Sequence, residues 1–372
     1  MISRIYKLED LIRKQKALVL YGARRVGKTT LLSDFLNRTD LKYKLDSGDN
    51  IRTQEVFNSQ DFKQILEYAS GYDIIAIDEA QQIQNIGMGL KILVDQMPGI
   101  MVIVTGSSSF ELSQQVGEPL TGRKKTLTLF PFSQSELLSK YNKFELREHL
   151  SEFLVFGSYP EVVLEPDIKK KIEILRELAE SYLLKDILSL DKIRNSRPIL
   201  SLLKLIAFQT GSQVSLNELA MQIGIDAKTV DRYLYLLENA FVIKKLGGYS
   251  RNLRNEVTSK AKYYFWDNGI RNAVIAQFNK IEDRNDIGIL FENFIITERL
   301  KANVYNNRYC TEYFWRTYSG QEIDLIEEQD GKLHGYEFKW SEKVKAKRPS
   351  QWSYENSDYQ VINKKNYLDF VL

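Results

Sequence analysis

Residues 22–29 form a glycine-bounded segment whose spacing suits phosphate binding. The segment GARRVGKT has glycines at 22 and 27, followed by Lys28 and Thr29. Glycines let backbone N–H groups fold around phosphate oxygens, a lysine reaches the β and γ phosphates, and a hydroxyl binds Mg²⁺. The pattern predicts a site for ATP and Mg²⁺. The residues expected around the phosphates are Gly22, Ala23, Arg24, Arg25, Val26, Gly27, Lys28, Thr29 and Thr30.

Two carboxylates end the apolar run YDIIAIDEA, which reads as a buried parallel strand. A carboxylate at such a strand end can hold the Mg²⁺ shell through water, and the next one can orient or deprotonate an attacking water. We assign the first role to Asp78, beside Thr29, and the second, catalytic role to Glu79, with Lys28. The alternative is a strand that ends in two solvated acids.

A third apolar run, GIMVIVTGSSSF, ends in small polar residues that include Ser107. A polar side chain there can sense the γ phosphate, although a strand-to-turn boundary has the same composition. Further along, TGRKKT places Arg123 in a basic turn. Arg123 is expected to contact the phosphates in the same chain or across a subunit interface, and a solvated turn is the alternative.

Acidic residues also gather near the C-terminus, in QEIDLIEEQDGKLHGYEFKW. The Asp330-Gly331 pair predicts a two-residue type I′ hairpin that places Asp324 opposite Glu337. Like charges so close destabilise a sheet, so a cation should lie between them, either Lys339 or a metal ion. The other face would pair Ile323 with Phe338 and Leu325 with Tyr336. A salt-bridged hairpin, with Glu322 opposite Lys339, is the alternative.

A further acid lies in the apolar segment DIGILFENFIITERL, which predicts a helix. Glu292 has apolar residues three and four positions away on both sides. A carboxylate in such surroundings is costly unless a cation or a donor meets it. Glu292, Asp324 and Glu337 are therefore the candidate metal ligands of the C-terminal third.

The composition limits the kind of protein that these groups serve. A chain of 372 residues predicts two to four domains, and its net charge of +3 does not indicate a general polyanion binder. One cysteine and two histidines leave oxygen ligands, and hence Mg²⁺, for any metal site. The longest apolar runs are too short to span a bilayer, and charges near the start leave no signal peptide, which predicts a cytoplasmic protein.

The middle of the chain predicts helices and then a DNA-binding pattern. Leucines alternate with charges at helical spacing over residues 136–198, which we expect to form a lid on the nucleotide site. In SLNELAMQIGIDAKTVDRYLYLLENAFVI, Ser215 and Glu218 form a capping-box pattern, Gly224 makes a turn, and a second helix begins near Asp226. This spacing is typical of a helix-turn-helix. Its outer face would carry Lys228, Asp231, Arg232 and Tyr235.

The following strands, FVIKKL and KYYFWD, bracket a basic wing. Arg251 and Arg254 lie in its loop, flanked by lysines at positions 244, 245, 260 and 262. Such a wing can contact phosphates of duplex DNA. The alternative is a winged helix that serves as a packing module, because Asp231 would repel phosphate.

The motifs GARRVGKTTLL, IAIDEAQ, VIVTGSSS, TGRKKTLTLFPFS and FGSYPEVV together resemble the AAA-type ATPases of bacteria and archaea that carry a C-terminal nuclease-like domain. Serine stands where the third motif often has asparagine. The acids followed by Glu337-x-Lys339 resemble the PD-(D/E)xK superfamily of restriction-endonuclease-like folds. That resemblance implies Mg²⁺ at the acids and Lys339 as the catalytic residue that assists water, although "EID" replaces the usual "PD".

The expected fold is α/β in four parts. These are a P-loop parallel-sheet ATPase domain (1–135), a helical lid (136–198), a winged helix-turn-helix (199–270) and a restriction-endonuclease-like domain (280–372). The expected activity is ATP hydrolysis used as a switch, with ATP, ADP and duplex DNA as partners, no membrane, and an oligomer allowed. The alternative is a nucleotide-gated DNA-binding or regulatory protein whose nuclease-like domain is catalytically silent.

Overall fold

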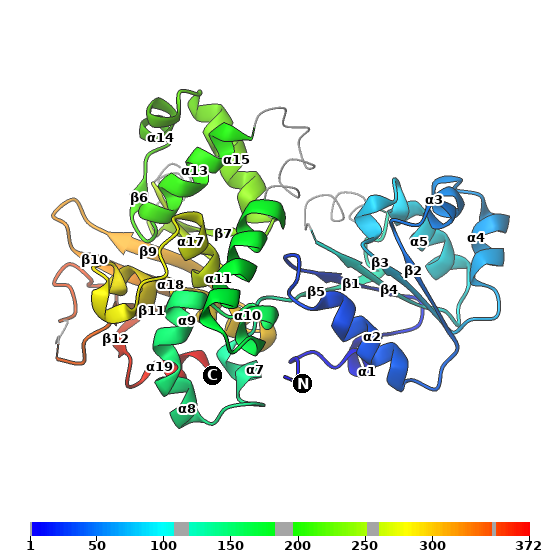
Figure 1. Ribbon diagram of the computed structural model, residues 1–372, viewed down its shortest axis with the longest axis horizontal. Coiled ribbons are helices and arrows are strands. Elements are labelled where there is room, and N and C mark those ends of the chain that lie inside the picture. The colour runs from blue at the N-terminus through cyan, green and yellow to red at the C-terminus, as the bar shows by residue number, and fades with distance from the viewer. Residues whose placement is uncertain (1, 108–118, 183–195, 251–259, 344–346) are drawn as a thin grey trace.

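The computed structural model describes residues 2–107, 119–182, 196–250, 260–343 and 347–372 (Figure 1). Two sheets organise the chain, one of five strands near the N-terminus and one of seven strands in the C-terminal half. Figure 1 shows them in two lobes that lie side by side. None of the helices in the described ranges has the length and apolar character needed to cross a bilayer.

The five-stranded sheet is parallel, with the strand order β2-β3-β4-β1-β5. Its three central strands are buried on both faces, as their continuous apolar sequences predict. The elements of this lobe are α1 (Leu8–Leu11), β1 (Ala17–Tyr21), α2 (Lys28–Arg38), β2 (Tyr43–Ser47), α3 (Ile51–Asn58), α4 (Phe62–Ala69), β3 (Ile74–Asp78), η1 (Ala80–Gln82), α5 (Ile86–Gln96), β4 (Met101–Gly106) and β5 (Lys124–Thr128).

Helices cover both faces of this sheet because successive side chains of a strand point to opposite sides. Leu18 and Leu20 of β1 belong to the same apolar cluster as Leu32 of α2. Val19, between them, belongs to a second cluster with Leu93 of α5. All strands run in one direction, so the turns after β1, β3 and β4 meet at one edge of the sheet.

The helical segment after β5 packs mainly on the C-terminal lobe, where α9 and α11 contact α17. The lid packed against the nucleotide site was expected here, and this segment meets the P-loop where Glu161 of α10 and Glu177 of α11 pair with Arg25. The elements are α7 (Gln134–Leu137), α8 (Lys143–Glu148), α9 (Leu150–Phe156), α10 (Pro160–Leu164), α11 (Ile168–Glu177) and the π-helix η2 (Leu178–Tyr182).

Two helices then flank the turn that was predicted at Gly224. Gly224 ends the first in the left-handed region, at φ 79°, and the Asp226 carboxylate caps the second by accepting from the Thr229 N–H at 2.9 Å. Ser215 begins the first helix but makes no side-chain capping bond in the described structure, so the capping-box prediction is wrong. The elements are α13 (Arg197–Phe208), β6 (Gln213–Val214), α14 (Leu216–Ile223), α15 (Ala227–Asn239), β7 (Ile243–Gly248) and β8 (Ala261–Phe265).

The second sheet joins these strands to those of the C-terminal third. Its order is β12-β11-β10-β9-β7-β8-β6, and β7 pairs in parallel with β9 through Gly247 and Gly248. The helix-turn-helix segment and the C-terminal third therefore share one sheet. The remaining elements are α17 (Asn268–Val274), η3 (Ile281–Asp283), α18 (Ile287–Tyr305), β9 (Thr311–Arg316), β10 (Glu322–Gln329), β11 (Lys332–Lys339), β12 (Ser357–Asn363) and α19 (Tyr367–Val371).

The predicted hairpin joins β10 and β11. Asp330 and Gly331 have φ values of 51° and 74°, as a type I′ turn requires, and Leu325 faces Tyr336. The pairing of β10 with β9 shifts register between Ile323 and Ile326, however. Such a bulge reverses the alternation of side chains, so Ile323 joins the apolar cluster of Ile326 instead of that of Phe338. The predicted pair of Ile323 with Phe338 is therefore wrong.

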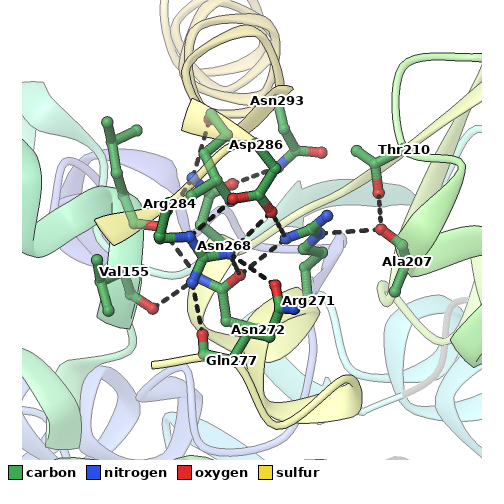
Figure 2. A network of polar contacts seen from close by, with 12 residues as sticks. Val155, Ala207, Thr210, Asn268, Arg271, Asn272, Gln277, Arg284, Asp286 and Asn293 are labelled. Carbon is green, nitrogen blue, oxygen red and sulfur yellow. Dashed lines mark hydrogen bonds and ion pairs between the residues drawn. The ribbon is translucent and has the colours of Figure 1, made fainter. Parts of the chain in front are cut away.

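A network of buried polar side chains joins α9, α13, α17 and α18 (Figure 2). Asp286 accepts from Arg271 Nη1 at 2.5 Å and from Arg284 Nε at 2.8 Å. The side chains of both arginines are 3% exposed. Asn293 of α18 donates to Asn268 Oδ1 at 2.6 Å. Because every buried donor here needs an acceptor, the network fixes how these helices meet.

Replacing Asp286 with alanine should lower the free energy of unfolding of this lobe by about 3–5 kcal/mol, because two buried arginines lose their counter-ion. All four tryptophans lie between residues 266 and 352, so tryptophan fluorescence during urea unfolding reports on this lobe alone. Asp283→Ala, in the exposed η3 turn nearby, is the matched control and should leave the midpoint unchanged. Equal midpoints for the two variants would contradict a central role for Asp286.

Candidate nucleotide site and acidic cluster

The glycine-bounded loop lies between β1 and α2, as predicted. Gly22 and Gly27 have φ values of 151° and 95°. A side chain at Gly22 would collide with the Leu129 carbonyl oxygen, which adds a packing reason for glycine there. Lys28 is 4% exposed, and its Nζ donates to the carbonyl oxygens of Gly22 at 2.8 Å and Ala23 at 2.9 Å. The lysine is thus held inside the loop where phosphates would lie.

The predicted Mg²⁺ residues meet at the same edge of the sheet. Thr29 Oγ1 donates to Asp78 Oδ2 at 2.8 Å, and Thr105 Oγ1 donates to the other oxygen, Oδ1. Thr105 reaches Asp78 because β4 lies between β1 and β3 in the sheet. A hydroxyl and a carboxylate held together beside a phosphate loop are the donors that Mg²⁺ takes with nucleotides. The residues present therefore fit Mg²⁺ with ATP.

Glu79 follows in a left-handed conformation, with a φ of 51°. Its N–H donates to Thr105 Oγ1 at 3.0 Å, and its Oε2 accepts from Gln81 Nε2 at 2.5 Å. Gln81 Nε2 also donates to Ser107 Oγ at 3.0 Å. Gln81 thus links Glu79 to Ser107. Thr105 belongs to the polar strand end that was predicted to sense the γ phosphate, but its contact with Asp78 and the role of Gln81 were not predicted, since nothing in the local pattern indicates which strand ends become neighbours.

Arg123 lies away from this edge. It directly precedes β5, whose first residue, Lys124, pairs with Ala17 at the start of β1. The loop follows the other end of β1, at Tyr21, so the length of a strand separates Arg123 from the phosphates. Arg123 instead pairs with Asp95 of α5. The predicted contact with phosphates in the same chain is therefore wrong, and a contact across a subunit interface stays a prediction.

A cavity of about 540 Å³ adjoins the loop on the α2 side. Such a volume suits a nucleotide base and ribose. No local pattern indicates this cavity, because its walls come from four separate segments. They are Ile2, Ser3, Arg4, Tyr6, Lys7, Glu9, Val26, Gly27, Thr30, Leu31, Asp34, Arg38, Phe132, Pro160 and Leu164.

In the C-terminal lobe the structure brings the predicted acids close together but places a lysine from β8 among them. Lys262 Nζ lies 2.5 Å from Glu322 Oε1 and 3.5 Å from Glu292 Oε1. Asp324 Oδ2 accepts from the Phe338 N–H at 2.8 Å. Glu337 Oε1 lies 2.5 Å from Lys339 Nζ. The predicted alternative pair of Glu322 with Lys339 does not form here, since each has another partner.

Burial and mutual repulsion affect how these acids titrate. Burial, and then the charge of Asp324, raise the pKa of Glu292 to about 8. The same two causes raise the pKa of Glu337 to about 6. Burial also raises the pKa of Asp324. The cluster therefore carries more acid than its cations balance.

The predicted metal site at Glu292, Asp324 and Glu337 is not assembled. Within residues 2–107, 119–182, 196–250, 260–343 and 347–372, no three histidine, cysteine, aspartate or glutamate side chains are arranged to hold a metal ion. Two lysine ammonium groups lie at the acids instead. The residues do not fit the group that the nuclease-like resemblance implies.

The predicted DNA-binding face is exposed in part. On α15, Lys228, Asp231, Arg232 and Tyr235 are exposed, while Val230, Leu234 and Leu237 are buried, as predicted. Lys262, predicted for the basic wing, is 2% exposed and cannot contact DNA, because it is paired with acids inside the lobe. Arg251 and Arg254 lie outside the described residues.

Three family models match the chain. Residues 14–138 match an AAA domain. The N-terminal third is therefore an AAA-type, ATPase-like domain. After the AAA-type domain, residues 147–281 match a domain of unknown function (DUF8612), and residues 287–369 match another (DUF4143).

Similar curated proteins are uncharacterized. One from Methanocaldococcus jannaschii is 25% identical over 86% of this chain and 74% of its own length. One from Haemophilus influenzae is 29% identical over 74% of each chain. Similar solved structures are domain III of the Thermotoga maritima replication initiation protein DnaA and a Pyrococcus horikoshii signal transduction ATPase with a tetratricopeptide repeat sensor. They share 15% and 12% identity, each at a TM-score of 0.28, and cover 44% and 79% of this chain and 85% and 46% of their own.

Proposed function

We propose that the chain binds ATP with Mg²⁺ and hydrolyses it, using the nucleotide as a switch. The observation that carries this proposal is the hydrogen-bonded chain from Thr29 through Asp78 to Thr105, directly beside the glycine loop. Phosphoryl transfer depends mainly on positioning and on electrostatic stabilisation, and these groups supply both at one edge of a rigid sheet.

Each residue of the site has a distinct role in this proposal. Backbone N–H groups of residues 22–30 bind the phosphates, and Lys28 turns from its present carbonyl partners to the β and γ oxygens. Thr29 and Asp78 hold Mg²⁺, which neutralises charge on the phosphates when bound. Glu79 orients and deprotonates the attacking water. Ser107 senses the γ phosphate through Gln81.

The cavity beside α2 is proposed to take the base and ribose. Its walls combine apolar side chains such as Val26, Phe132 and Leu164 with the polar groups that fix orientation in ligand sites. It adjoins Gly27 and Thr30 of the phosphate loop, so one ligand can fill both. A nucleotide therefore fits better than an isolated phosphate.

Arg25 offers a route by which the nucleotide acts on the rest of the chain. It lies within the phosphate loop, and its guanidinium pairs with Glu161 at 3.1 Å and Glu177 at 3.0 Å. Both acids belong to the helical segment, whose α11 packs on α17 of the other lobe. A change in loop conformation on ATP binding would break or move these pairs, and so shift one lobe relative to the other.

Release of inorganic phosphate from ATP by the purified full chain tests this proposal. Phosphate release should require Mg²⁺ and should stop when EDTA is added, because the proposed site needs the metal to hold the β and γ phosphates. Thr29→Val, which removes the hydroxyl at nearly constant volume, should reduce turnover at low Mg²⁺ more than at high Mg²⁺. Lack of Mg²⁺-dependent turnover in the wild type would remove the proposal.

Duplex DNA is proposed as the target because of the outer face of α15. Lys228 and Arg232 are exposed there beside Tyr235, which is 53% exposed. A helix that follows a tight turn and presents cations in this way can enter a major groove. Within the part of the chain that the structure describes, the acids of the C-terminal lobe are not arranged as a metal site, so we propose DNA binding without metal-dependent cleavage.

Binding to duplex DNA should weaken with salt, and the double change of Lys228 and Arg232 to alanine should lower the slope of log K against log salt by up to about two, roughly one for each lost phosphate contact. Fluorescence anisotropy of a labelled duplex across a salt series measures this slope. Asp231→Asn on the same face is the matched control and should strengthen binding, because it removes a charge that repels phosphate. A slope unaffected by either change would favour a packing role for α15.

A further inference from the structure

Lys262 is a charged residue on a fully buried strand, a position that lysine rarely occupies. It lies on β8, in the sequence AKYYF, whose five residues are all buried. Its side chain is 2% exposed. A buried ammonium group is unfavourable unless acids surround it, and removing those acids would leave a large desolvation cost. The acidic side chains around Lys262 therefore indicate the role of its charge.

The partners of Lys262 come from two elements that follow it in the chain. Glu292 projects from α18, at 3.5 Å, and Glu322 from β10, at 2.5 Å. The negative charge of Asp324, also on β10, acts on the same lysine. Phe314 of β9 closes the site, with its ring centre 5.3 Å from Nζ. One ammonium group thus pairs with two carboxylates and feels the charge of a third, and carboxylate oxygens are also ligands of divalent cations.

Neighbouring contacts hold the lysine in place. Tyr264, two residues along β8 and so on the same face, donates to Glu292 Oε1 at 2.8 Å. Asn293 of α18 pairs with both the N–H and the carbonyl oxygen of Phe265, each at 2.8 Å. β8 is thereby fixed against α18 on both sides of the acid. These contacts fix the position of the strand that carries Lys262.

The second lysine at the cluster, Lys339, has a different environment. Lys339 lies 2.5 Å from Glu337 and is 34% exposed, so it is tied to one acid at the rim. Lys262 lies deeper and bridges acids from two elements. Lys339 is therefore the cation at the hairpin acid Glu337, while Lys262, from the strand that was predicted to flank a DNA-binding wing, pairs with Glu292 and Glu322.

We infer that Lys262 is a built-in counter-ion that stands where a divalent cation would otherwise bind Glu292, Glu322 and Asp324. Its ammonium group thereby offsets the repulsion among these acids. Lys262 also joins the helix-turn-helix segment to this lobe through charge, in addition to the shared sheet. This inference does not depend on ATP hydrolysis.

Lys262→Met tests this role, because methionine keeps the length and apolar stem of the lysine without its charge. The full chain without nucleotide is unfolded by heat in EDTA and in increasing Mn²⁺, with tryptophan fluorescence as the readout. The wild type should show no Mn²⁺-dependent shift. The variant should melt lower in EDTA and gain about 5–10 °C at saturating Mn²⁺, because a ligand bound only by the folded state stabilises it. Calorimetric titration should give one Mn²⁺ bound at the new site.

Two matched variants separate this effect from a general loss of charge. Lys245→Met changes an exposed lysine on the adjacent β7 and should create no Mn²⁺ response. Adding Asp324→Asn to Lys262→Met should remove the gain, because a ligand is lost. An equal Mn²⁺ gain in the wild type, or the lack of any gain in Lys262→Met, would overturn the inference.

Failure of Lys262→Met to fold in EDTA has its own test. Mn²⁺ in the refolding buffer should then restore the native tryptophan signal. The double variant Lys262→Met with Glu322→Gln should fold without metal, because the acid nearest the ammonium group, at 2.5 Å, is removed together with its counter-ion. If neither Mn²⁺ nor the second substitution restores the fold, Lys262 is needed for packing and the counter-ion role is wrong.

Discussion

Replacing Lys28 with alanine is expected to abolish measurable ATP binding by the full chain. The ammonium group is buried in the glycine loop, where it donates to two carbonyl oxygens of the loop. It is therefore already positioned next to the phosphates of a bound nucleotide. Loss of one partner from a buried charged contact costs about 2–5 kcal/mol, which corresponds to a loss of roughly 30-fold to several thousand-fold in affinity. Fluorescence anisotropy of a labelled ATP analogue measures this loss of affinity.

The control must show that the loss comes from the site and not from unfolding. Lys63→Ala removes an exposed lysine of α4 in the same domain and should bind ATP like the wild type. Lys28→Arg keeps a positive charge but cannot fit the same two carbonyl oxygens, so it should bind weakly. ATP binding by Lys28→Ala within a few-fold of the wild type would remove the phosphate-loop assignment.

Local patterns predicted the position of the glycine loop and of the acidic strand end beside it, because both are short and regular. The loop spacing from Gly22 to Thr29 depends on backbone conformation alone, and an apolar run ending in Asp78 marks a strand buried on both faces. The contact of Thr105 with Asp78 and the role of Gln81 were not predicted, for the opposite reason. Their roles depend on β4 lying between β1 and β3, and strand order is set by long-range packing that periodicity does not record.

The wrong prediction for Arg123 has the same cause, because local patterns do not record how strands are placed in the sheet. Its neighbours in sequence are basic and follow a glycine, which suggested phosphate contact. Its position depends on the direction of β5, which runs parallel to β1 and so carries Arg123 to the far edge of the sheet. A composition-based argument cannot distinguish the two ends of a strand.

The hairpin of the C-terminal lobe shows both the strength and the limit of a local signal. Asp330-Gly331 fixed the turn and the pairing of Leu325 with Tyr336. The bulge near Asp324 could not be predicted, because it arises from pairing with β9. Lys262 carried a signal that was overlooked. A lysine within the apolar run AKYYF needs acid partners if the strand is buried on both faces.

Glu79→Gln is expected to separate binding from chemistry. The Glu79 N–H donates to Thr105 Oγ1 at the end of β4, and the Glu79 carboxylate accepts from Gln81 Nε2. These two hydrogen bonds fix the direction of the carboxylate. Glutamine has nearly the same shape and leaves the phosphate loop intact, so ATP affinity should stay within a few-fold of the wild type. An amide cannot accept the proton of the attacking water, so turnover should fall by about 10²–10⁴-fold.

Single-turnover phosphate release, measured beside nucleotide affinity, distinguishes this result from a damaged site. Glu67→Gln, an exposed glutamate of α4, is the matched control and should hydrolyse ATP at the wild-type rate. Parallel loss of affinity and turnover in Glu79→Gln would mean that Glu79 shapes the loop instead of acting on water. Unchanged turnover would place the base elsewhere.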